Sequence, residues 1–179
     1  MYLSKIHIEN FKGIKSADFD FDRSVNIIIG NNGAGKTSVL EAIAVALGGF
    51  LSGIDGVNTI HFSRDEIRRE SQLTGTGSSN VVYRTPISVE TCLELNTGDR
   101  DCADLRMFKF ARQKKSIKSA RSTVEPRDIC REAQRMANDQ KAILPVISYQ
   151  SFSRVTNQKK DKWENPFSDE YSRVVGYVD

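Results

Sequence analysis

The strongest constraint on the fold is the segment Gly30–Thr37, which reads GNNGAGKT and fits the pattern G-x-x-x-x-G-K-[ST] without a mismatch. An almost wholly apolar, β-branched run, Val25–Ile29, precedes it. Such a run predicts a strand that is buried on both faces in the middle of a sheet. After the segment, apolar residues recur every three or four positions and predict an amphipathic helix over residues 36–48. The expected apolar stripe of this helix comprises Val39, Leu40, Ile43, Ala44, Leu47 and Phe50.

A strand, a glycine-rich turn and a helix in this order allow the backbone to enclose a polyphosphate. The glycines let successive N–H groups turn inward, and the helix N-terminus adds partial positive charge. Lys36 then reaches the β- and γ-phosphates, the Thr37 hydroxyl ligates Mg²⁺, and Ser38 approaches the α-phosphate. We therefore predict a site for ATP and Mg²⁺, because an incidental lysine in a glycine-rich turn would not explain the flanking strand and helix. The predicted nucleotide-binding residues here are Gly30, Asn31, Asn32, Gly33, Ala34, Gly35, Lys36, Thr37 and Ser38.

Hydrolysis also needs an acidic residue at the end of a neighbouring apolar strand, where it orients Mg²⁺ and the attacking water. None of the thirteen aspartates meets this condition well. Asp169 follows no predicted strand, and Asp179 follows a run, Val174–Val178, that Gly176 interrupts. We therefore assign no catalytic residue and expect little or no turnover by this chain alone, with Asp179 as the alternative. The absence of D-x-x-G and N-K-x-D segments gives a GTPase little support.

The remaining periodicity predicts an antiparallel β layer. Residues 2–9, 17–21 and 87–95 alternate apolar and polar side chains, as half-buried strands do. Residues 105–110 are expected to pair with 87–95. Together with the strand–turn–helix segment, this layer predicts an α/β fold.

Further along the chain, residues 71–80 are rich in Gly, Ser and Thr and are expected to form a flexible loop. Thr123 is a candidate N-cap for a helix over 124–140. An apolar strand is expected over 142–149, although Pro145 argues against a regular central ladder. The apolar face of the predicted helix contains Ile129, Ala133 and Met136.

The net charge is only +3, but cations crowd into residues 112–121, which contain no acid. A smaller cluster lies at 159–162. Two interpretations stay open for the first cluster, a solvated loop and a surface that contacts nucleic acid phosphates. The cations are Arg112, Lys114, Lys115, Lys118 and Arg121 in the first cluster and Lys159, Lys160 and Lys162 in the second.

Other classes of protein are disfavoured. No apolar run approaches the roughly 20 residues of a membrane helix, and residues 1–7 lack the apolar core of a signal peptide. The three cysteines form no C-x-x-C pair, and only two histidines accompany them, which disfavours a zinc site. We therefore expect a cytoplasmic protein with reduced cysteines and no membrane partner.

The sequence resembles the N-terminal part of an SMC/RecF-type ABC ATPase head. The matching segments are Lys5–Ile14 (KIHIENFKGI), Val25–Ile29 and Gly30–Ile43 (GNNGAGKTSVLEAI). The resemblance implies a P-loop NTPase in which residues 1–150 form the N-terminal lobe of the head and residues 151–179 begin its helical lobe. It also implies that Lys12, within Asn10-Phe11-Lys12, lies near the nucleotide.

A later stretch, Leu144–Arg154 (LPVISYQSFSR), is similar to the LPVIAYYGTxR segment of RecF-like AAA proteins found beside retrons and in Septu-type antiphage systems. Ser151 and Phe152 replace the Gly and Thr of that subgroup. In ABC heads a glutamine at the end of such a strand approaches Mg²⁺ and the γ-phosphate. The resemblance thus makes Gln150 a ligand of nucleotide and Mg²⁺, with an ordinary loop glutamine as the alternative.

In this family the remaining ATPase motifs follow that glutamine, and the chain ends about thirty residues past Gln150. We therefore expect the first half of a head, whose function is to bind ATP. The resemblance implies that the complete ATPase acts in DNA repair, DNA maintenance or phage defence. Its implied partners are the C-terminal half of the head, a second copy in a head-to-head homodimer, DNA and a nuclease. The alternatives are a self-contained P-loop kinase or other NTPase, and a non-hydrolysing ATP-sensing or DNA-binding module.

Overall fold

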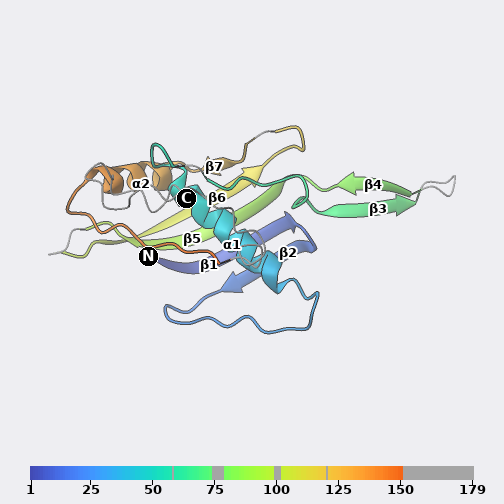
Figure 1. Ribbon diagram of the computed structural model, residues 1–179, viewed down its shortest axis with the longest axis horizontal. Helices are drawn as coiled ribbons and strands as arrows, with labels where there is room; N and C mark the ends of the chain where they lie inside the picture. Colours follow the sequence, from blue (N-terminus) through green and yellow to red (C-terminus); the bar gives the residue numbers. More distant parts are fainter. Residues whose placement is uncertain (58, 74–78, 99–101, 120, 151–179) are drawn as a thin grey trace, which may run out of the picture.

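The computed structural model describes residues 1–57, 59–73, 79–98, 102–119 and 121–150. The strands are β1 (Tyr2–Phe11), β2 (Ile14–Asp20), β3 (Arg69–Leu73), β4 (Ser79–Tyr83), β5 (Ile87–Asn96), β6 (Leu105–Lys114) and β7 (Thr123–Glu125), and the helices are α1 (Lys36–Leu51) and α2 (Asp128–Asn138). Five strands form an antiparallel sheet in the order β2-β1-β5-β6-β7, and α1 and α2 pack on one face of it (Figure 1). The hairpin β3–β4 extends beyond one end of the sheet.

The alternating sequence of the strands sorts side chains between the two faces of the sheet. Ile6 in β1 lies opposite both Phe19 in β2 and Thr91 in β5, and this row faces the helices. The next row, which contains His7 and Glu90, carries polar side chains on the opposite face. The predicted strands over 2–9, 17–21, 87–95 and 105–110 and their antiparallel pairing are therefore confirmed.

Helix α1 packs tightly on the sheet through small residues. Ala42 and Ala46 are fully buried, and a Cβ added at Gly49 would lie only 2.8 Å from the Phe110 ring in β6. A Cβ at Gly48 would overlap the guanidinium of Arg112. The predicted helix is confirmed, but its predicted apolar stripe is partly wrong, because Leu40 is 48% exposed. The small residues face the sheet because they permit a close approach, which hydrophobicity alone does not predict.

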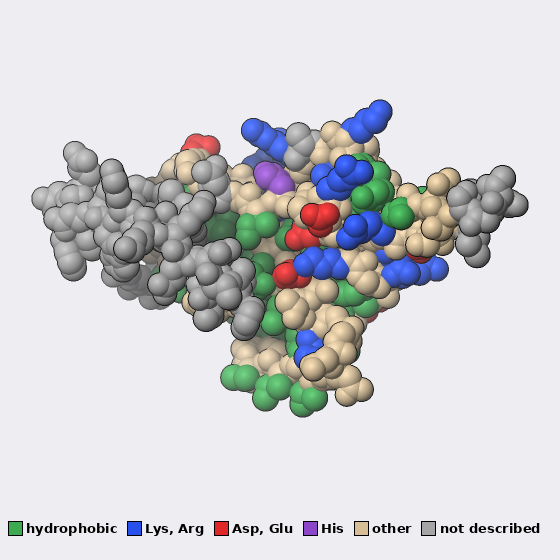
Figure 2. Space-filling view, turned by 45° about the vertical axis from the view of Figure 1, so that its right-hand side comes forward, with side chains coloured by type: hydrophobic (Ala, Val, Ile, Leu, Met, Phe, Trp, Pro, Cys, Tyr) green, Lys and Arg blue, Asp and Glu red, His purple; other side chains and the backbone are tan. Residues whose placement is uncertain are grey.

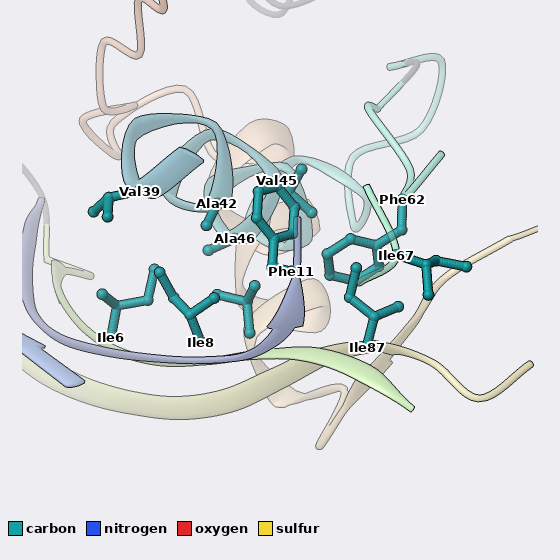
Figure 3. Close-up of a cluster of buried hydrophobic side chains, with 11 residues drawn as sticks. Ile6, Ile8, Phe11, Val39, Ala42, Val45, Ala46, Phe62, Ile67 and Ile87 are labelled. Carbon is teal, nitrogen blue, oxygen red and sulfur yellow. The ribbon is translucent and has the colours of Figure 1, made fainter. Parts of the chain in front are cut away.

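Two clusters of buried side chains form the core. Figure 3 shows the first cluster, in which α1 lies over β1 and the start of β5. Phe11 and Phe62 meet there edge to face, with ring centroids 6.1 Å apart. The second cluster joins the end of α1 to α2 and the far half of the sheet. The buried residues of this second cluster are Phe50, Ile54, Leu93, Leu95, Phe110, Val124, Ile129, Ala133, Met136 and Ala142.

The run Val25–Ile29 differs from its prediction as a buried strand. It pairs with no strand of the described residues, and the exposed fractions of Val25, Ile27 and Ile29 are 80%, 78% and 88%. Only Ile28 packs against the core. A strand becomes buried on both faces only when other strands flank it, and the described part of the chain supplies none beside this run. Apolar side chains accordingly project at the lower end of Figure 2, where Figure 1 shows the connection between β2 and α1.

Three other predictions are corrected. Residues 142–149 form no strand, and Val146 is 94% exposed. Residues 71–73 and 79–80 belong to the β3–β4 hairpin rather than to a loop. Thr123 caps no helix because it pairs with Gln113 in the sheet, and α2 begins only at Asp128. The predicted apolar face of that helix is confirmed, since Ile129, Ala133 and Met136 are all buried.

The α/β class and the antiparallel layer are thus confirmed. The cations at 159–162, Asp169, Asp179 and the proposed start of a helical lobe at 151–179 lie outside the described residues. Within the described ranges, no helix has both the length and the apolar character needed to cross a bilayer. The same ranges contain no group of three or more His, Cys, Asp or Glu side chains suited to a metal ion.

Candidate nucleotide-binding site

The glycine loop before α1 adopts a conformation that depends on its glycines. Gly33 and Gly35 have φ angles of +84° and +89°, in the left-handed region that side chains disfavour. A Cβ added at Gly30 would lie 3.3 Å from the Cβ of Ala34. The Ala34 N–H donates to the Asn31 carbonyl oxygen at 3.1 Å and closes the turn. The loop is therefore preformed, with its shape set by the residues of the sequence pattern.

The N-terminus of α1 is open to an anion. Gly35 occupies the N-cap, and no described side chain forms a capping hydrogen bond there. The first turn contains no acidic residue, and the first backbone bond of the helix runs from Val39 N–H to the Gly35 carbonyl oxygen at 3.0 Å. The N–H groups of the first turn and the positive end of the helix dipole are therefore directed at the space beside the loop.

Lys36 is folded into the loop. Its Nζ donates hydrogen bonds to the carbonyl oxygens of Gly30, at 2.7 Å, and of Asn31, at 2.8 Å. Thr37 is exposed and Ser38 is half-buried at the start of the helix. The residues from Gly30 to Ser38 thus form one loop and the start of α1, with the Lys36 ammonium folded back onto the beginning of the loop. The donor set of residues 30–38 suits a polyphosphate, because it combines an ammonium with backbone N–H groups and includes no carboxylate.

Lys12 lies in the turn between β1 and β2. Lys12 and Asn10 both have positive φ, +50° and +54°. Three hydrogen bonds fix the turn: Lys12 N–H to the Glu66 carbonyl oxygen at 2.6 Å, Arg68 N–H to the Asn10 carbonyl oxygen at 2.9 Å, and Asn10 Nδ2 to the Pro86 carbonyl oxygen at 2.8 Å.

The Lys12 ammonium pairs with the carboxylate of Glu41 on α1. The sequence motifs assign no role to Glu41, although this residue lies within the segment Gly30–Ile43 that carries the family resemblance.

Gln150 is exposed at the end of the described chain, and its Nε2 donates to Ser148 Oγ at 3.1 Å. The neighbouring Tyr149 lies within electrostatic range of the Lys12–Glu41 pair. Burial raises the pKa of its hydroxyl and the charge of Glu41 raises it further, whereas Lys12 opposes the shift. The roles of Lys12 and Gln150 at a nucleotide stay predictions.

The basic cluster at 112–121 is divided between the interior and the surface. Arg112 is fully buried and donates to Val45 O at 2.7 Å, Ser122 Oγ at 3.0 Å and Thr59 Oγ1 at 3.1 Å. Burial lowers the pKa of Arg112 to about 10. Arg112 thus connects α1 to two loops and is a structural residue.

Lys114 is 6% exposed and donates to the Phe62 carbonyl oxygen at 3.2 Å. The sequence allows two interpretations of the cluster, a solvated loop and a surface that contacts nucleic acid phosphates. Each interpretation requires exposed side chains, so neither applies to Arg112 or Lys114. Lys115, Lys118 and Arg121 remain exposed. In the middle of the face drawn in Figure 2, Lys and Arg side chains lie beside Asp and Glu side chains, so that region carries both signs of charge.

Comparison with known proteins adds family membership to this geometry. A model of the AAA domain family matches residues 5–174. The DNA replication and repair protein RecF of Francisella tularensis subsp. novicida (strain U112) is 51% identical over 43 residues, and so is that of subsp. tularensis (strain SCHU S4 / Schu 4). The aligned stretch is 24% of this chain and only 12% of each RecF.

A solved structure from work on ATP-driven dimerization and DNA stimulated activation of SMC ATPases is also similar. It has a TM-score of 0.44 and 23% sequence identity, over 69% of this chain and 68% of that one. The resemblance to the N-terminal part of SMC/RecF-type ATPases is confirmed by the family match together with the RecF alignment. Because the family match spans most of the chain, this protein belongs to the AAA domain family.

Proposed function

We propose that this chain binds ATP with Mg²⁺ as the nucleotide-binding part of an SMC/RecF-like ABC-type ATPase head. The observation that carries the proposal is the preformed glycine loop at the open N-terminus of α1, with the Lys36 ammonium inside it. Within residues 30–38 this arrangement offers N–H donors and a cation to phosphate oxygens, and the loop itself contains no carboxylate.

Each residue of the site has a proposed role. The N–H groups from Gly30 to Ser38 hold the phosphates, and Lys36 exchanges its two carbonyl partners for phosphate oxygens. The Thr37 hydroxyl binds Mg²⁺, which neutralises phosphate charge when bound. Gln150 would be a further ligand of the same ion, and Lys12 would supply a second cation.

The architecture of the complete protein is also a proposal. Residues 1–150 act as the N-terminal lobe of the head, and residues 151–179 begin the helical lobe. The exposed apolar side chains of Val25, Ile27 and Ile29 support a partner that adds strands beside them, which is the C-terminal half of the head. A role in DNA repair, DNA maintenance or phage defence, a head-to-head homodimer, and DNA and nuclease partners rest on the family resemblance. We place the protein in the cytoplasm.

A DNA-binding module remains the second candidate. The observation that favours it is the exposure of Lys115, Lys118 and Arg121 in one short loop. Cations so arranged can neutralise phosphates along a nucleic acid backbone.

Two measurements on residues 1–179 test the proposed function. In titrations, MgATP and MgADP should bind more tightly than AMP, because the loop holds the β- and γ-phosphates. Phosphate release from MgATP should stay well below about 1 per second, the lower end for typical enzymes, until the C-terminal half is added. Equal affinity for AMP would contradict the phosphate site. A stable monomer that turns over at enzyme rates would contradict the half-head, and would make Asp179 a catalytic candidate and favour a self-contained NTPase.

A further inference from the structure

We infer that Glu41 controls the nucleotide site by holding the Lys12 ammonium, so that Lys12 exchanges between Glu41 and the phosphates of the nucleotide. The inference rests on the proposed function. Its direct observation is the ion pair between Lys12 Nζ and Glu41 Oε2, which joins the β1–β2 turn to α1. No motif of the sequence assigns a role to Glu41.

The position of Glu41 suits this role. It lies four residues after Thr37, which corresponds to about 6 Å along the helix axis. The ammonium that it holds is therefore close to the helix N-terminus. A lysine carries its charge on a flexible four-carbon chain, so the ammonium can shift between neighbouring acceptors without a change in the backbone.

Hydrogen bonds hold the backbone around Lys12, so an exchange of acceptors by the ammonium involves only the side chain. Left-handed conformations of non-glycine residues persist only where the surroundings enforce them. Here, hydrogen bonds to the carbonyl oxygens of Glu66 and Pro86 hold Lys12 and Asn10. With the turn held by these hydrogen bonds, the side chain of Lys12 has its charged partner in Glu41.

The pair is also partly shielded from water. The side chains of Lys12 and Glu41 are 31% and 27% exposed, and Tyr149 lies close enough for both charges to act on its hydroxyl. Partial burial weakens screening by salt and makes the attraction stronger than that of a fully exposed pair. A polyphosphate at the helix N-terminus must therefore compete with Glu41 for Lys12.

Both lysines of the proposed site are held by oxygen acceptors, but these acceptors differ in charge. Lys36 is held by the carbonyl oxygens of Gly30 and Asn31, and Lys12 is held by a carboxylate. Carbonyl oxygens carry only partial charge, so a phosphate displaces them more readily than it displaces a carboxylate. Glu41 thus sets how much of the charge of Lys12 is available to the nucleotide.

The experiment measures MgATP affinity of residues 1–179 by equilibrium dialysis in a set of variants. Glu41→Gln should tighten binding by about fivefold, the upper end for a partly exposed ion pair. Removal of any nearby negative charge would also tighten binding, so the comparison of Lys12→Met with Lys12→Met/Glu41→Gln is decisive. In the Lys12→Met background the gain should vanish. Asp128→Asn, which removes the acid of an exposed pair with Arg131 on α2, is the matched control and should change nothing.

A second variant separates the effect of the ion pair with Lys12 from the effect of the negative charge itself. Glu41→Asp keeps the negative charge but retracts it by one methylene, so it should also tighten MgATP binding. Thermal unfolding shows whether each variant is folded. An unchanged affinity in both Glu41 variants, or the same gain with and without Lys12, would overturn the inference while the proposed function stands. Failure of the wild-type chain to bind MgATP would contradict both.

Discussion

The Lys36 ammonium donates a 2.7 Å hydrogen bond to the carbonyl oxygen of Gly30, the first glycine of the loop. The bond joins the two ends of the loop and gives the ammonium a partner that a phosphate oxygen can replace. Because Gly33 and Gly35 already have positive φ angles, the proposed binding of a phosphate would require exchange of hydrogen-bond partners rather than refolding of the loop.

The first prediction concerns an unpaired hydroxyl beneath α1. Thr91 is 2% exposed, and its Oγ1 is the one fully buried side-chain oxygen or nitrogen of the described residues without a hydrogen-bond partner. Thr91→Val should leave the free energy of unfolding unchanged or raise it, because it removes an unsatisfied polar group at constant volume.

Thr97 provides the control for that substitution. Its Oγ1 donates to Asp104, with both acceptor oxygens at 3.0 Å. Thr97→Val should lower the free energy of unfolding by about 1 kcal/mol, as measured by urea denaturation. Equal losses in the two variants would show that Thr91 has a partner in solution.

The second prediction concerns pH. The Nδ1 of His61 accepts from Arg112 Nη2 at 3.3 Å and lies 2.9 Å from Ser122 Oγ. Burial lowers the pKa of His61 below 6.5, and the charges of Arg112, Arg121 and Lys114 lower it further. The folded state thus favours neutral His61, so its contribution to stability is complete above pH 6.5 and is lost as the pH falls below that value.

Urea unfolding at pH 7.5 and pH 5.5 measures this loss. His61→Asn should reduce the difference in unfolding free energy between the two pH values, because the amide oxygen accepts the same hydrogen bonds and does not titrate. A pH dependence that is unchanged in His61→Asn would assign the effect to other groups.

The third prediction concerns self-association. The side chains of Val25, Ile27 and Ile29 form an exposed apolar strip, and such strips promote association. Residues 1–179 should show low solubility or concentration-dependent oligomers in size-exclusion chromatography with light scattering. Ile27→Thr/Ile29→Thr should shift the chain toward monomer, whereas Val81→Thr, at a residue 57% exposed on β4, should not. A wild-type chain that stays monomeric at high concentration would refute the prediction.

Much of the antiparallel layer could be predicted from sequence, because its signals are local. The alternation in β1 and β5 reports directly which residues face the helices, and the glycines of the loop report the backbone angles that it needs. The face of Ile129, Ala133 and Met136 was predictable for the same reason.

The remaining features depend on neighbours that are distant in sequence. Val25–Ile29 has the composition of a central strand, but strand pairing is decided by other segments. Thr123 has the chemistry of an N-cap, yet pairing with Gln113 takes it into the sheet. Glu41 and Arg112 read as surface charges, because nothing local reveals the partners that the fold brings to them.

The most direct test of the account is calorimetric titration of MgATP into residues 1–179 and into Lys36→Ala. The wild-type chain should bind, and the variant should bind about 10- to 150-fold more weakly, which corresponds to the roughly 1.5–3 kcal/mol of a charged hydrogen bond. Lys115→Ala, which removes an exposed lysine beyond β6, should bind like wild type. Equal affinity of the wild-type chain and Lys36→Ala would contradict the assignment of the nucleotide site.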